Sequence, residues 1–256
     1  MPNHVYAHVP FSMLSANLPV ILDRRINPEI FFPGDVLDGL VPEEVGAVAE
    51  TLGEAGLRCT FHAPFIDLNP GSAERLIREA TRRRFEQVLA AADILRPDVI
   101  VFHPGYDKWR YGESQDKWLA HSIDAWNWVL ERTEKIGTIV AVENIFEEEP
   151  STLRALFEAI NHPRLRHCFD VGHWNLFHKV GMEEWFAEVG TYIAETHIHD
   201  NFGTRDDHLP VGEGEIDFDL FFSLMARYAP DAAWTIEAHC REAVGRALAN
   251  LERYQR

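Results

Sequence analysis

The sequence predicts a (β/α)₈ barrel, the fold also called a TIM barrel, spanning residues 1–256 as a single domain. Strand-like and helix-like segments alternate from end to end, and no linker, low-complexity tract or shift in composition interrupts them. A length of 256 residues is typical of one such barrel. The alternation would also suit an open, doubly wound sheet, but the chain lacks GxGxxG and GxxxxGK[ST], the usual nucleotide-binding signatures of that fold. The closed barrel is therefore preferred.

Short runs of apolar, largely β-branched and aromatic residues predict eight strands. They are Val5–Val9, Ile30–Phe32, Leu57–Phe61, Val99–Phe102, Ile139–Val142, Arg166–Phe169, Ile193–Ile198 and Trp234–Ile236. Apolar residues at helical spacing predict helices between them. These are Pro42–Ala55, Ser72–Leu95, Ser114–Ile136, Ser151–Ile160, Met182–Val189, Phe218–Tyr228 and Arg241–Tyr254. The first connection, Phe11–Leu22, has the weakest pattern and is the one most open to irregular structure.

Residues at the expected helix ends agree with these boundaries. Ser72 and Ser151 stand where a helix N-cap is expected, and Pro42 precedes two acidic residues in a first helical turn. Gly56 and Gly137 follow helical segments and directly precede strands, where helix-ending glycines are common.

The composition indicates a soluble protein with free thiols. No apolar run approaches the ~20 residues needed to span a bilayer. The N-terminal MPNHVYAHVPF lacks the basic start and long apolar core of a signal peptide, so we expect a cytoplasmic protein that does not associate with membranes. Cys59 and Cys168 fall in apolar strand-like runs and Cys240 has no CxxC partner, so a disulfide scaffold is not expected. The oligomeric state is left open.

The net charge disfavours nucleic acid as a partner. The chain has 24 basic and 41 acidic residues, and 24 − 41 gives −17. A surface of that sign repels polyanions at long range, whereas nucleic-acid-binding proteins usually carry a basic face. Tight DNA binding is therefore not the preferred interpretation.

Nine potential metal ligands lie in seven short motifs, most of which end a predicted strand. They are His62, His103, Glu143, Asp170, His173, His197, Asp206, His208 and Glu237. Because the carboxyl ends of barrel strands converge on one mouth, residues ending strands three to eight can meet there. A carboxylate that ends a buried strand is costly unless a cation compensates it, which favours ligand roles for Glu143 and Glu237. Imidazole and carboxylate without thiolate suit Zn²⁺, Mn²⁺ or Fe²⁺ rather than a closed structural zinc site.

Charge counting favours several ions over one. The four carboxylates and five neutral imidazoles carry −4, so three divalent ions would leave +2 and a single ion would leave −2. A positive surplus suits an anionic substrate and an activated water molecule.

The motifs HAPF, HPG, VEN, FDVGH, HIHDN, DDHLPVGEGEID and IEAH resemble the xylose isomerase-like TIM-barrel superfamily (AP endonuclease family 2), and the resemblance covers most of the chain. The superfamily includes endonuclease IV, sugar isomerases and epimerases. Resemblance to endonuclease IV implies three zinc ions. The first would be held by His62, His103 and Glu143, the second by Glu143, Asp170, His197 and Glu237, and the third by His173, Asp206 and His208. The isomerase and epimerase branch typically holds one metal, through the equivalents of Glu143, Asp170, His197 and Glu237.

We therefore expect a metal-dependent phosphoesterase or phosphodiesterase acting on a small anionic metabolite, with up to three ions, most readily zinc. Glu143 and Glu237 would be catalytic, orienting or deprotonating the attacking water. The alternative is a single-metal sugar or sugar-phosphate isomerase or epimerase; a DNA-repair endonuclease and a non-catalytic binding barrel are less favoured. Residues expected to support the ligands or contact substrate are Asn144, His199, Asp200, Phe65, Trp109 and Trp174.

Overall fold

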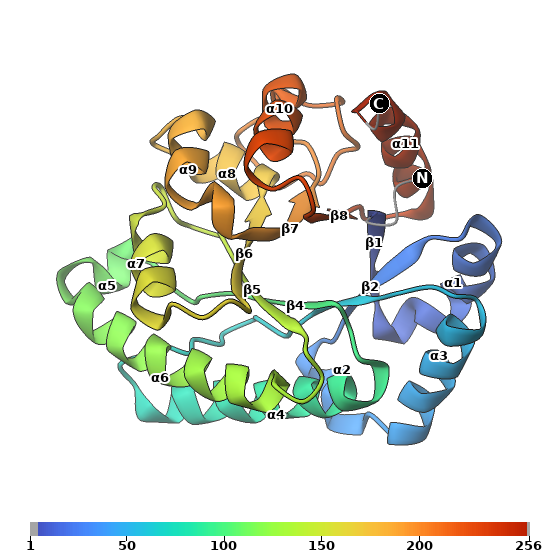
Figure 1. Ribbon diagram of the computed structural model, residues 1–256, viewed down its shortest axis with the longest axis horizontal. Coiled ribbons are helices and arrows are strands. Elements are labelled where there is room, and N and C mark those ends of the chain that lie inside the picture. Colours follow the sequence, from blue (N-terminus) through green and yellow to red (C-terminus); the bar gives the residue numbers. More distant parts are fainter. Residues whose placement is uncertain (1–4, 255–256) are drawn as a thin grey trace.

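The computed structural model places eight parallel strands, paired in chain order, in one closed barrel surrounded by helices (Figure 1). It describes residues 5–254, so the first four and last two residues of the predicted 1–256 domain lie outside it. The strands are β1 (Val5–Pro10), β2 (Asn27–Phe31), β3 (Thr60–His62), β4 (Val99–Phe102), β5 (Ile139–Glu143), β6 (Leu165–Asp170), β7 (Ile193–Ile198) and β8 (Ala233–Ile236). Pairing of β1 with β8, in which Val5 lies opposite Trp234, closes the barrel. The predicted fold class is confirmed.

Helices cover the outside of the barrel and connect each strand to the next. They are α1 (Phe11–Arg24), α2 (Gly34–Gly39), α3 (Pro42–Glu54), α4 (Arg75–Leu95), α5 (Lys108–Tyr111), α6 (Gln115–Thr133), α7 (Ser151–Ile160), α8 (Val171–Phe177), α9 (Met182–Val189), α10 (Phe218–Tyr228) and α11 (Arg241–Leu251). Of these, α7, α9 and α10 have the predicted bounds. The short helices α2, α5 and α8 lie in connections where no helix is predicted.

The first connection differs most from expectation, because Phe11–Arg24 forms a regular helix. Its buried residues Leu14 and Ile21 are two turns apart and therefore lie on one face, which packs on the barrel. Arg25, in the left-handed conformation, ends the helix by donating its N–H to the carbonyls of the last turn.

Two predicted N-caps are wrong. Glu74 rather than Ser72 caps α4, since its side chain accepts a hydrogen bond from the N–H of Leu76. Ser151 is the first residue inside α7 rather than its cap. The glycine predictions agree with the structure, because Gly56 and Gly137 both have positive φ, at 63° and 72°.

Alternate strand residues contribute to two different cores. Val99, Val101, Ala141 and Cys168 form a small cluster of their own, while residues between them in the sequence, such as Ile100, belong to the main core. This period-2 alternation separates the barrel interior from the layer between strands and helices. The same alternation directs the polar residues at the strand ends into the mouth of the barrel.

His167 lies on the helix-facing side of β6 and is fully buried. Its Nδ1 donates to the carbonyl of Val142 at 2.9 Å, and its Nε2 accepts from Nε1 of Trp185 at 3.4 Å, so the ring is held neutral. Burial lowers the pKa of His167 to about 4.

A histidine with a lowered pKa stabilises the fold above its unfolded pKa of ~6.5, and this stability is lost as the pH falls towards 4. We expect His167 to make the free energy of unfolding fall by about 2–3 kcal/mol between pH 7.5 and 4.5. Urea denaturation of the metal-free protein and of His167→Gln at both pH values measures it. An equal pH dependence in the two proteins would contradict the prediction.

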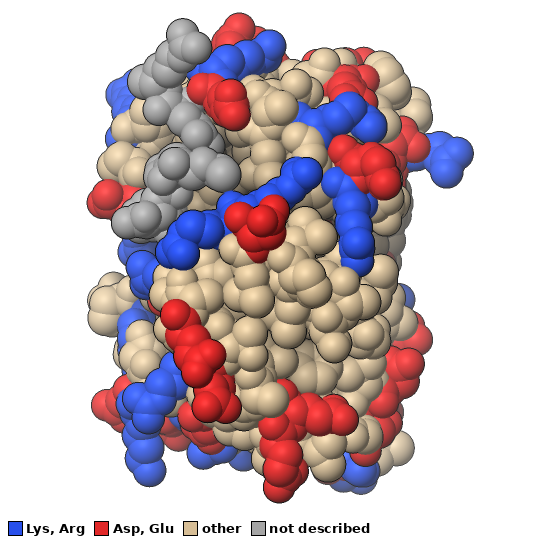
Figure 2. All heavy atoms as spheres, turned by 90° about the vertical axis from the view of Figure 1, so that its right-hand side faces the viewer, with Lys and Arg blue, Asp and Glu red and all other residues tan. Residues whose placement is uncertain are grey.

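The surface and the cysteines agree with the composition. On the face shown in Figure 2, acidic and basic side chains are interspersed around a largely uncharged centre. Cys59 and Cys168 are buried free thiols and Cys240 is an exposed one. Within residues 5–254, none of the helices has the length and apolar character required to cross a membrane.

Candidate metal centre

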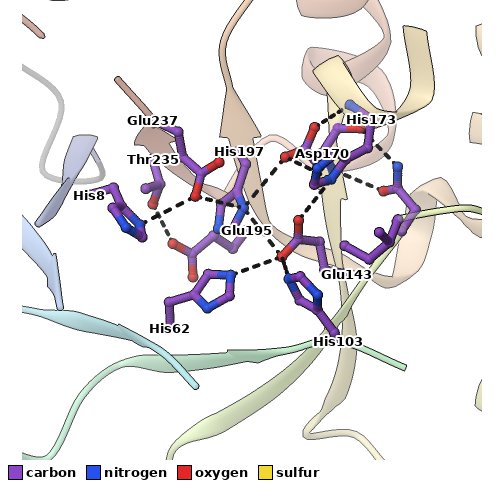
Figure 3. A network of polar contacts seen from close by, with 12 residues as sticks. His8, His62, His103, Glu143, Asp170, His173, Glu195, His197, Thr235 and Glu237 are labelled. Carbon is purple, nitrogen blue, oxygen red and sulfur yellow. Dashed lines mark hydrogen bonds and ion pairs between the residues drawn. The ribbon is translucent and has the colours of Figure 1, made fainter. Parts of the chain in front are cut away.

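Glu143, the last residue of β5, lies at the centre of a ring of histidines in the barrel mouth (Figure 3). Its Oε2 is 3.3 Å from Nε2 of His62, 3.3 Å from Nε2 of His103 and 3.5 Å from Nδ1 of His197. Its Oε1 is 3.1 Å from Nδ1 of His173. One carboxylate is thus shared by histidines from four different segments of the chain, as a bridging ligand would be.

His197, on β7, is fully buried and joins the residues that end the neighbouring strands. Its Nδ1 is 3.5 Å from Oε2 of Glu143, 3.8 Å from Oδ2 of Asp170 and 3.5 Å from Oε1 of Glu237. Figure 3 shows these three carboxylates turned towards the His197 ring from β5, β6 and the end of β8. The four residues predicted to hold one metal therefore lie together.

The remaining predicted ligands form a third group beside the first two. Oδ2 of Asp206 is 3.0 Å from Nε2 of His208 and 3.6 Å from Nε2 of His173. Asp206 and His208 lie in the long connection between β7 and α10, where His208 has φ of 48°. All nine predicted ligands are thus brought to the same mouth, although their roles as ligands remain predictions.

Two predicted supporting residues bind the backbone around the site. Asn144 makes two hydrogen bonds with the backbone of Asp170, donating to its carbonyl and accepting from its N–H, each at 2.9 Å. The Asp200 carboxylate accepts from the N–H groups of Gly212, Gly214 and Ile216, and so fixes the connection that carries His208.

His199 lies closer to the ligands than a supporting role requires. Its Nε2 is 3.2 Å from both carboxylate oxygens of Asp170, and its ring stacks on His208 with centroids 4.0 Å apart. One ligand atom each from His199, His208 and Glu237 lie within 4.8 Å of one another, close enough to share an ion.

The three aromatic candidates have different surroundings. Phe65 stacks on the His103 ring at 4.2 Å and meets His62 edge to face at 5.3 Å, so it covers two predicted ligands. Trp174 is largely buried and stacks on His178 at 4.0 Å. Trp109 is 88 % exposed, and nothing in the structure directs it into the site.

Three residues of the site are absent from the predicted set. His8 on β1 places Nδ1 3.0 Å from Oε1 of Glu29 and 3.3 Å from Oε1 of Glu237. Glu29 on β2 and Glu195 on β7 are fully buried in the barrel interior. His8 lies mid-strand and Glu29 follows a proline, so neither has the strand-ending position that singles out the predicted ligands. The predicted barrel fold could have indicated them, because its first two strands also direct alternate side chains into the barrel interior.

Proton positions in the site compensate for its many carboxylates. Burial alone would raise the pKa of Glu143 and Glu237, but His197 and its neighbours hold both pKa values well below the usual range. Burial alone would lower the pKa of His173, but Asp170, Asp206 and Glu143 raise it well above its usual value. The carboxylates likewise raise the pKa of His197, so without a metal His173 and His197 would carry positive charge that offsets them. A metal ion would displace these protons, since ligating imidazoles must be neutral.

Several buried polar atoms of the site make no hydrogen bond to one another but could bind a metal ion. Glu143 Oε2 and Nδ1 of His173, His197 and His199 are buried without a hydrogen-bond partner among residues 5–254. Unsatisfied buried polar groups are costly, and an ion among them would satisfy them together. The donor set, imidazole nitrogen and carboxylate oxygen, suits Zn²⁺, Mn²⁺ or Fe²⁺.

Fold and site together define a class, the TIM barrels with a cluster of imidazole and carboxylate groups at the C-terminal mouth. The chain belongs to the xylose isomerase-like TIM barrel family, whose model matches residues 29–255. The uncharacterized protein MJ1311 of Methanocaldococcus jannaschii is 28 % identical over 213 residues, covering 80 % of this chain and 73 % of the relative. A second protein of that organism, MJ1614, is 32 % identical over 167 residues, or 64 % of each chain.

Solved structures with the same fold cover almost the whole chain. The TTHB071 protein from Thermus thermophilus, soaked with ZnCl₂, has a TM-score of 0.83 at 24 % identity and covers 98 % of this chain and 97 % of its own. A D-tagatose 3-epimerase-like protein has a TM-score of 0.82 at 24 % identity with the same coverage. The 3-keto-D-glucoside 4-epimerase YcjR of E. coli has a TM-score of 0.75 at 15 % identity, covering 98 % of each chain. These likenesses confirm the fold, and the family is the predicted one; the narrower resemblance to endonuclease IV stays a prediction.

Proposed function

We propose that the protein is a metal-dependent isomerase or epimerase of a small, sugar-like substrate. The observation that carries the proposal is the placement of Glu143 and Glu237, which approach Nδ1 of His197 from different strands at 3.5 Å each. Two carboxylates on either side of one position can take a proton from a substrate carbon and return it. The sequence leaves this function open as the alternative. The structural neighbours include sugar epimerases, which favours it over phosphoester hydrolysis.

Glu143, Asp170, His197 and Glu237 would hold the ion. A divalent ion there would polarise a carbonyl and so acidify the neighbouring C–H bond. One of the two glutamates would take that proton, leaving its electron pair as a carbon–carbon double bond while the carbonyl π pair moves onto oxygen. A proton returned to the same carbon by the other glutamate would invert that carbon. A proton returned to the former carbonyl carbon, with transfer of the hydroxyl proton to the other oxygen, would move the carbonyl. Asp170, fixed by Asn144 and His199, keeps its position throughout.

The structural neighbours support a sugar-like substrate, because a D-tagatose 3-epimerase-like protein and a 3-keto-D-glucoside 4-epimerase share this barrel over nearly its full length. The site also supplies many hydrogen-bonding groups for hydroxyls. His62, His103 and His208 surround the four-residue set and are partly or largely buried.

Phosphoester hydrolysis is the second candidate, and one observation favours it. His173, Asp206 and His208 form a further ligand group that a single ion does not require. Together with His62 and His103 at Glu143, this group would allow up to three ions. The number of ions per chain therefore separates the two functions.

Metal counting and one substitution test the proposal. We expect one tightly bound ion per chain by mass spectrometry, and incorporation of solvent deuterium next to the carbonyl when ketohexoses or their phosphates are incubated in D₂O. His208→Ala should keep the ion and lower the exchange rate by about 10- to 100-fold, since His208 supports Glu237 from 3.8 Å. Close to three ions, with cleavage of bis(p-nitrophenyl) phosphate that His208→Ala abolishes, would replace the proposal with the second candidate. Circular dichroism of the variant controls for unfolding.

A further inference from the structure

Glu29 connects two histidines of the mouth through separate oxygens. It lies on β2 with no exposed surface. Its Oε2 is 3.1 Å from Nε2 of His197, and its Oε1 is 3.0 Å from Nδ1 of His8. A carboxylate only accepts hydrogen bonds, so both ring nitrogens that face it carry protons.

This contact determines which nitrogen His197 can offer to a metal. With Nε2 donating to Glu29, the neutral ring has its lone pair on Nδ1. That nitrogen faces the carboxylates of Glu143, Asp170 and Glu237 and has no hydrogen-bond partner in the part of the chain that the structure describes. Glu29 and the carboxylates of the predicted metal site therefore lie on opposite sides of one imidazole.

Glu195 of β7 lies beside this pair. Its Oε1 accepts hydrogen bonds from Thr60 and Thr235, and one of its carboxylate oxygens lies within 4.8 Å of Glu29 and His197. Glu29, with one oxygen on each imidazole, is the carboxylate that bonds to His197.

We propose that Glu29 is a positioning residue, which fixes the ring of His197 with Nδ1 towards the metal-binding carboxylates and thereby raises metal affinity. The inference rests on the metal centre of the proposed function, and holds equally for one ion or several. A carboxylate behind a metal-binding imidazole orients the ring and increases its basicity, and its loss typically lowers metal affinity by 10- to 100-fold.

Zinc affinity, measured by competition with a chromophoric chelator, tests the proposal. We expect Glu29→Gln to weaken Zn²⁺ binding by about 10- to 100-fold. Glu147→Gln is the control, because it makes the same substitution at a buried glutamate outside the site, whose carboxylate accepts a hydrogen bond from the N–H of Ile145, and it should leave the affinity within about twofold of wild type. Glu29→Asp keeps the charge but withdraws it by one methylene, so it provides a milder variant with an intermediate loss should Glu29→Gln fail to fold.

A spectroscopic readout separates positioning from general support of the barrel. In zinc-loaded protein labelled with ¹⁵N-histidine, the wild type should show a slowly exchanging, downfield Nε2 proton on His197, assigned by its absence in His197→Gln. Glu29→Gln should shift this proton upfield and speed its exchange, and Glu147→Gln should not. Equal affinities for wild type and Glu29→Gln, or a zinc ion on Nε2 of His197, would overturn the role of Glu29 alone. A wild type that binds no Zn²⁺, Mn²⁺ or Fe²⁺ would overturn the metal centre, and the proposed function with it.

Discussion

Glu143→Gln is expected to lower catalytic activity by at least about 10³-fold while leaving the barrel folded. The substitution preserves shape but removes the negative charge that four histidines share, at 3.1 to 3.5 Å. It removes a metal ligand and an acid–base group at once, and the loss of an acid–base group alone typically costs 10²- to 10⁴-fold. Deuterium exchange into the substrate, metal content and the far-ultraviolet circular dichroism spectrum measure the three consequences.

The same substitution at Glu147 provides the comparison. Glu147 is buried like Glu143, but its carboxylate accepts a hydrogen bond from the N–H of Ile145, so Glu147→Gln should keep activity and metal content near those of wild type. A Glu143→Gln protein that retains its metal and more than about one tenth of the activity would show that Glu143 is neither a ligand nor a proton-transfer group.

Most of the fold, and the convergence of the nine candidate residues on one mouth, could be predicted because both depend on local signals. A polar residue that ends an apolar strand, as Glu143 ends β5 and Glu237 follows β8, is visible in the sequence itself. Parallel strands in a barrel then bring such residues to one mouth without any knowledge of side-chain packing.

The rest of the site depends on contacts between distant segments. Glu29 is 168 positions away from His197, whose ring it contacts, and its surroundings PEIFF contain no motif. The helix Phe11–Arg24 could not be predicted because its local helical pattern is weak. It is stabilised instead by packing of Leu14 and Ile21 on the barrel. Distances across the barrel, and not propensities, decide these features.

Gly172, between the predicted ligands Asp170 and His173, is required for the space it leaves and not for backbone freedom. The glycine of FDVGH suggests a tight turn that needs backbone freedom, but Gly172 lies within helix α8 and is not among the residues with positive φ. Its function is to leave space. A Cβ at this position would lie 2.0 Å from Cε1 and 2.5 Å from Nδ1 of His199.

Gly172→Ala is therefore expected to disrupt the site and to destabilise the fold by about 1–3 kcal/mol, the usual cost of overpacking a buried position. His199 cannot move freely, because its ring bonds to Asp170 and stacks on His208, so relief of the clash displaces predicted ligands. Gly46→Ala is a control in helix α3, where a Cβ meets nothing within 4 Å, and it should stabilise the protein by about 0.5–1 kcal/mol.

A double-mutant cycle assigns the effect to this single contact. In a His199→Ala background the space beside residue 172 is open, so adding Gly172→Ala should no longer destabilise the protein and should instead raise the free energy of unfolding by up to about 1 kcal/mol, as at Gly46. Chemical denaturation of the four proteins yields the coupling directly. Gly172→Ala could instead be as destabilising without the His199 ring as with it. The glycine would then be required by the helix itself. In that case the close approach of α8 to β7 would not be what fixes the position of Asp170 and His173.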